Sequence, residues 1–102
     1  MTSALSIREI DKVIVRDILR AHLPPGAKVW VFGSRALGTN KPAADLDLAL
    51  DAGRPLTRLE GGALADVFEE SDLPYKVDVV DLWTVNESFR TIIEAARTEF
   101  EP

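Results

Sequence analysis

The sequence contains no cysteine and only one histidine among its 102 residues. Disulfide bonds, zinc–thiolate sites and thiol nucleophiles are therefore excluded, and cysteine-free chains suit a reducing compartment. The first residues lack the basic and apolar segments of a secretory signal, and no run of about 18 apolar residues could span a membrane. We therefore expect a cytoplasmic protein without a membrane anchor.

The sequence also lacks an excess of basic residues. Aspartate and glutamate outnumber lysine and arginine by 17 to 12, which gives a net charge of −5. Because an acidic protein repels phosphate backbones, we do not expect a free-standing nucleic-acid binder. With 46% hydrophobic residues the chain can bury a core, and its length suits one domain over residues 1–102.

Hydrophobic spacing predicts three helices and three strands. Ser6 and Glu9 have the spacing of a capping box. The apolar residues that recur at the helical period are Ile7, Ile10, Ile14 and Ile18, and Val13 and Leu19 widen this stripe. Strands are expected at 29–32, 45–51 and 77–82, and further helices at 57–71, opened by a Thr57–Glu60 capping box, and at 86–100.

This order of elements predicts an α/β (α+β) fold, with a small mixed sheet of three core strands covered by helices. The loop between the first two strands is too short for a crossover helix, so they should pair antiparallel, whereas a helix separates the second and third strands, which should pair parallel. The end of the first strand and the starts of the other two then lie at one edge of the sheet.

Acidic residues gather at this predicted edge. Asp45 and Asp47 share one face of their strand, where two negative charges would repel each other. Magnesium removes this penalty, because it prefers hard oxygen ligands and is commonly held by one or two carboxylates together with substrate phosphates. Alternation in the third strand adds Asp78 near its start and places Asp81 at its far end.

A Gly-Ser turn precedes the acidic pair. Gly33 would let a phosphate approach the backbone, Ser34 offers a hydroxyl, and Arg35 could add positive charge. A phosphate cradle beside three carboxylates is what two-metal phosphoryl or nucleotidyl transfer needs, with two ions about 3.5–4 Å apart.

The combination of Gly33-Ser34, Asp45-x-Asp47 and Asp78 resembles the DNA polymerase β-type nucleotidyltransferase superfamily, and the short length resembles its minimal nucleotidyltransferases. The resemblance covers nearly the whole chain and implies a nucleotidyltransferase-type fold. It implies transfer of AMP from ATP to a hydroxyl, with Asp45 and Asp47 on two magnesium ions, Asp78 on the ion that activates the acceptor, and Gly33 and Ser34 on the triphosphate. It further implies an antitoxin that adenylylates a HEPN-domain toxin, in a homo- or hetero-oligomer.

Two departures from the family pattern bear on nucleotide affinity and choice. Ala44 stands where many members carry a serine, and Leu37 stands where many carry a basic residue. Neither departure removes one of the three carboxylates.

Two other functions remain open from the sequence. The chain could be a binding module that neutralises its partner by occlusion, using the apolar face of the last helix. It could also modify a small hydroxylated molecule, although relatives that do so generally carry an extra helical domain. We expect a protein acceptor, because the catalytic core alone leaves few residues that could bind any other kind of acceptor.

Overall fold

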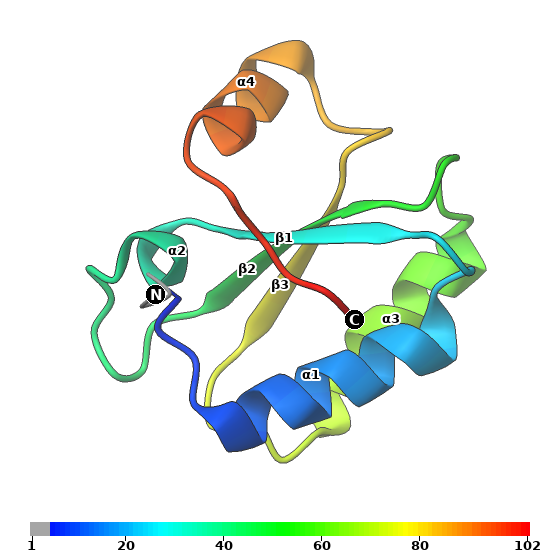
Figure 1. The fold of residues 1–102 in the computed structure, drawn as a ribbon. Coiled ribbons are helices and arrows are strands. Elements are labelled where there is room, and N and C mark those ends of the chain that lie inside the picture. Colours follow the sequence, from blue (N-terminus) through cyan, green and yellow to red (C-terminus); the bar gives the residue numbers. More distant parts are fainter. Residues whose placement is uncertain (1–4) are drawn as a thin grey trace.

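The computed structural model describes residues 5–102, in which helices and strands alternate (Figure 1). The first four residues of the expected domain lie outside this description. The elements are α1 (Glu9–His22), β1 (Lys28–Phe32), α2 (Ser34–Leu37), β2 (Leu46–Asp51), α3 (Arg58–Glu70), β3 (Val77–Asp81), α4 (Glu87–Ala95) and β4 (Thr98–Glu99).

The strands form one mixed sheet in the order β3-β2-β1-β4. β1 pairs antiparallel with β2, and β2 pairs parallel with β3, which confirms both predicted pairings. The register places Asp47 between Phe32 of β1 and Asp78 of β3. The fourth strand was not predicted.

α1 and α3 cover one face of the sheet and bury the main core (Figure 1). Leu46, Leu48 and Leu50 point into this core and are fully buried, as their alternation predicted. The predicted stripe on α1 was partly wrong, because Ile10 and Val13 are exposed. The helix is rotated so that it buries a face on which Asp11, Val15 and Leu19 lie.

α4 lies on the other face of the sheet and covers only part of it (Figure 1). Its buried Ile93 packs with Ala49 and Leu82 in a small second cluster. The prediction of one helix over 86–100 was wrong beyond residue 95. The chain becomes extended there, β4 pairs with β1, and the backbone N–H of Phe100 donates to the carbonyl of Val29.

The two predicted capping boxes have different outcomes. The Thr57–Glu60 box is confirmed, because each side chain accepts a hydrogen bond from the other residue's backbone N–H. The Ser6–Glu9 box was wrong: α1 begins after Arg8, and the backbone N–H of Ser6 donates to the carbonyl of Arg35 instead. Among residues 5–102, no helix is both long enough and apolar enough to cross a membrane.

Candidate active site

The candidate site lies at the edge of the sheet where β1 ends and β2 and β3 begin. Asp47 stands opposite Asp78 across the parallel pair, and Asp45 immediately precedes β2. We call Asp45, Asp47 and Asp78 the carboxylate cluster. Asp45 is exposed and the other two are half-buried, so the cluster is accessible from solvent.

Burial and neighbouring negative charges act on the central carboxylate, Asp47. Burial raises the pKa of Asp47, and the negative charges of Asp78 and Asp45 raise this pKa further. Each of these causes disfavours the ionised form. Positive charge placed among the three side chains would favour it, so the donor set fits a hard divalent cation.

Lys76 supplies a positive charge beside this cluster. Its Nζ atom lies 3.4 Å from Oδ1 of Asp78, whose side chain is 44% exposed. Over residues 5–102, no three Asp, Glu, His or Cys side chains lie close enough together to hold a metal ion without moving. A cation bound by all three carboxylates would therefore have to compete with Lys76 for Asp78.

Gly33 provides the close approach between the turn and the cluster. Its φ is +74°, a conformation that L side chains rarely adopt, and a Cβ atom at this position would lie 2.5 Å from Oδ2 of Asp47. Ser34 begins the short helix α2 directly after it. The turn and Asp47 therefore lie together, as the sequence predicted.

The structure does not support the expectation that Arg35 contacts a phosphate. Its side chain is buried, with only 4% of the residue exposed, and it packs 3.9 Å from the centroid of the Tyr75 ring. The guanidinium donates to the carbonyl oxygens of Ala44, Pro42 and Ser6. Arg35 therefore positions the loop that leads into Asp45, and each of its three side-chain nitrogens donates to a backbone carbonyl.

The sequence argument missed Lys76 and Tyr75. Lys76 lies two residues before Asp78, so strand alternation places both on one face, and this spacing could have indicated their ion pair. The contact between Tyr75 and Arg35 spans 40 residues of chain and has no local signal. Asp81 lies outside the site, because its carboxylate accepts from the backbone N–H groups of Leu56 and Trp83.

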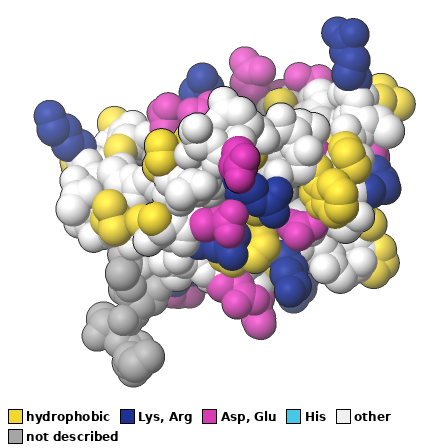
Figure 2. All heavy atoms as spheres, turned by 90° about the horizontal axis from the view of Figure 1, so that it is seen from above, with side chains coloured by type: hydrophobic (Ala, Val, Ile, Leu, Met, Phe, Trp, Pro, Cys, Tyr) yellow, Lys and Arg dark blue, Asp and Glu magenta, His cyan; other side chains and the backbone are white. Residues whose placement is uncertain are grey.

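The surface seen from the α4 side carries mixed charge. Figure 2 shows lysine and arginine side chains interspersed with aspartate and glutamate on this face, with apolar side chains between them. The described residues of this face therefore offer no continuous basic surface for a phosphate backbone.

Comparisons with known proteins agree with this geometry. A sequence profile described as "Nucleotidyltransferase domain" matches residues 12–101. The chain is 45% identical over 89 residues to a probable protein adenylyltransferase, MntA of Haemophilus influenzae, and the match covers 87% of this chain and 77% of that protein.

Solved structures share the fold. A toxin–antitoxin complex with AMP-PNP superimposes with a TM-score of 0.76 at 24% identity, covering 88% of this chain and 72% of that one. An MntA–HepT toxin–antitoxin structure gives a TM-score of 0.70 at 19% identity, covering 91% of this chain and 71% of that one. The profile match over most of the chain and the 45% identity together show that this chain belongs to the nucleotidyltransferase family of enzymes.

Proposed function

We propose that this nucleotidyltransferase transfers AMP from ATP to a hydroxyl of a partner protein, and that the partner is a HEPN-type toxin which it neutralises in the cytoplasm. The observation that carries the proposal is the carboxylate cluster beside Gly33, in which burial and two neighbouring charges raise the pKa of Asp47. The name of the MntA relative and the AMP-PNP complex among the structural neighbours support the substrate and the acceptor class.

The residues at this edge would have separate roles in binding magnesium and the triphosphate. Asp45 and Asp47 would hold two magnesium ions, and Asp78 would share the ion on the acceptor side. Bound magnesium supplies the positive charge that offsets the triphosphate and makes the acceptor hydroxyl more acidic. Gly33 leaves the backbone open to the triphosphate, and the Ser34 hydroxyl can donate to a phosphate oxygen.

The proposed reaction is a displacement at the α-phosphorus of ATP. The acceptor oxygen forms a bond to this phosphorus while the bond between the phosphorus and the oxygen bridging to the β-phosphate breaks. Pyrophosphate leaves, and the proton of the acceptor hydroxyl passes to the carboxylate of Asp78. Lys76, whose Nζ lies 3.4 Å from Oδ1 of Asp78, orients this carboxylate before the acceptor arrives.

Intact-mass spectrometry of this chain, purified with the protein encoded by the adjacent gene, tests the proposal. Incubation with ATP and magnesium should add one or more AMP units to the neighbouring protein, and Asp47→Ala should abolish the addition. EDTA should abolish it as well. No mass gain in a stable complex would contradict the proposal.

Neutralisation by binding alone is tested by a second experiment in cells. Asp45→Ala combined with Asp47→Ala removes the acidic pair and leaves the exposed apolar side chains of α4, such as Ile92 at 66% exposure, unchanged. The double variant should fail to protect cells from the partner. Full protection would show that occlusion, and not AMP transfer, is the mechanism.

A further inference from the structure

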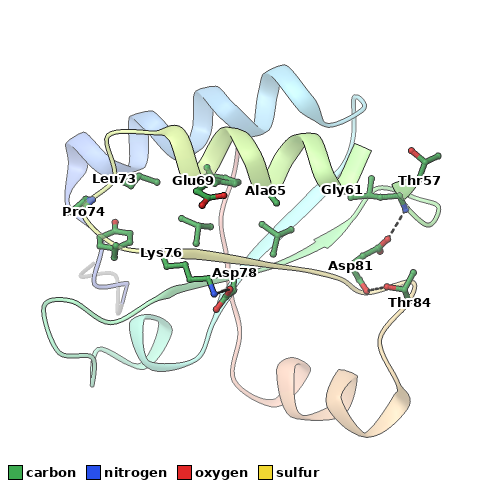
Figure 3. Close-up of a pocket in the computed structure, with 15 residues that line it drawn as sticks. Thr57, Gly61, Ala65, Glu69, Leu73, Pro74, Lys76, Asp78, Asp81 and Thr84 are labelled. Atoms are coloured by element: carbon green, nitrogen blue, oxygen red, sulfur yellow. Dashed lines mark hydrogen bonds and ion pairs between the residues drawn. The ribbon is translucent and has the colours of Figure 1, made fainter. Parts of the chain in front are cut away.

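A groove runs along the outer side of β3, away from β2 (Figure 3). Its volume is 780 Å³, and we call it the outer-edge groove. α3 forms one wall, through residues that include Gly61, Ala65 and Glu69, and Leu73 and Thr84 lie toward its two ends (Figure 3). Nothing in the proposed chemistry uses this groove as a whole.

Unpaired backbone groups of β3 face into the groove. Among residues 5–102, β3 is the last strand of the sheet, so within this range only one of its sides is paired. The carbonyl of Lys76 accepts from Leu46, and the N–H of Leu82 donates to Leu50, so the even-numbered residues direct their backbone groups toward β2. By alternation, the N–H and C=O groups of Val77 and Val79 point outward, where another strand could pair with them.

α3, which lies above this edge, leaves room for an added extended segment. A Cβ atom added at Gly61 would meet no atom within 4 Å, and Ala65, which faces the strand in Figure 3, is exposed. Small residues on this side of α3 therefore keep the groove open over the middle of β3. An added strand would lie about 4.8 Å from β3, the normal spacing within a sheet.

The outer-edge groove is continuous with the candidate active site. Lys76 and Asp78 line it, and Figure 3 shows both side chains on the side of β3 opposite α3. Successive side chains of an extended segment point to opposite faces. One set would pack beneath α3, and the other set would lie on the face that carries the carboxylate cluster.

We propose that the outer-edge groove binds an extended segment of the acceptor protein as a fifth strand beside β3, which brings a hydroxyl side chain of that segment to Asp78. The inference rests on the proposed function, because it names how a protein acceptor is held. Backbone pairing would supply affinity, and the alternating side chains would supply the choice of residue.

Filling the groove tests this docking directly. Ala65→Tyr places a large side chain in the groove, and Ala63→Tyr places the same side chain at an exposed position of α3 outside it. Ala65→Tyr should lower kcat/KM for AMP transfer to the adjacent-gene protein at least tenfold, with the affinity for AMP-PNP unchanged. Ala63→Tyr should change neither quantity.

Three results would overturn the inference in distinguishable ways. Transfer by Ala65→Tyr at the wild-type rate would show that the acceptor does not use the groove. An equal loss of AMP-PNP affinity would show that the groove holds the nucleotide. Absence of transfer by the wild-type chain would overturn the proposed function itself, and the inference with it.

Amide hydrogen exchange gives an independent readout on the unmodified chain. Binding of the adjacent-gene protein should slow exchange at the amides of Val77 and Val79 at least tenfold, because both would become bonded to the added strand. The inward amide of Val80, already bonded within the sheet, should change little. Unchanged exchange at Val77 and Val79 in a formed complex would rule out strand addition.

Discussion

At the scale of single residues, the site depends on contacts that allow little substitution. Gly33 is the clearest case, because its positive φ and the carboxylate of Asp47 each exclude a side chain. A second glycine, Gly53, shares the positive φ, at +80°, but an added Cβ would meet no atom within 4 Å. The two glycines therefore separate backbone strain from crowding of the site.

Gly33→Ala should lose both stability and activity, and Gly53→Ala should lose stability alone. Each substitution puts an alanine at a positive φ, a sparsely populated backbone conformation that costs about 1–3 kcal/mol. Only Gly33→Ala displaces Asp47, and misplacing a reacting group by about 1 Å costs on the order of a hundredfold in rate. Denaturant unfolding and AMP-transfer assays on both variants measure the two effects. Equal rates in the two variants would show that the approach of Gly33 to Asp47 does not matter for transfer.

At the scale of secondary-structure elements, local sequence signals predicted an element correctly where the residues that form its contacts are close in sequence. α3 begins at a capping box whose glutamate, Glu60, also forms an ion pair with Arg54. These hydrogen bonds lower the pKa of Glu60 to about 2, and the hydrogen bond from Arg54 has the largest effect. A carboxyl whose pKa falls on folding stabilises the folded state above its ordinary pKa and loses this contribution as the pH falls toward the folded value.

Glu60→Gln should therefore lower the melting temperature at pH 7, because the ionised carboxylate is the form that Arg54 and the backbone of Thr57 bind. The difference from the wild type should shrink as the pH falls from about 4.5 to about 2. Thermal melts across this range measure it, with Glu70→Gln, an exposed position at the other end of α3, as the control. A difference that stays constant with pH would contradict the pairing.

Elements that depend on distant contacts were not predictable from local patterns. β4 has only two residues, and Phe100 falls at a spacing that also suits the face of a continued helix. α1 buries a face different from the predicted one, and on this face the buried Asp11 accepts from Arg8 and from the Tyr75 hydroxyl, 64 residues away. The carboxylate cluster was predictable because strand alternation is a local rule, whereas the outer-edge groove depends on how α3 packs over β3.

At the scale of the whole molecule, the C-terminal segment after β4 connects the sheet to the main core. Phe100 is 4% exposed and packs into that core, while the guanidinium of Arg16 on α1 lies over its ring. Arg16 also donates to the carbonyl of Glu101. The last residues therefore hold α1 against the β4 side of the sheet.

Phe100→Ala should destabilise the fold by about 3–5 kcal/mol, the usual cost of removing a buried phenylalanine. Phe89→Ala is the matched control, because Phe89 is 37% exposed and contacts Phe32 edge-on, so its loss should cost clearly less. Urea unfolding of both variants gives the comparison. Similar losses would show that the C-terminal segment adds little to the core.

The anchoring of Arg35 has a consequence for how this enzyme can diverge. The guanidinium binds the loop before Asp45 through the carbonyl oxygens of Pro42 and Ala44, and every amino acid supplies a backbone carbonyl. Side chains in this loop, including Lys41 and Ala44, can therefore be exchanged without loss of the anchor. Selection or design could therefore vary the side chains of this loop while its backbone stays anchored beside the acidic pair.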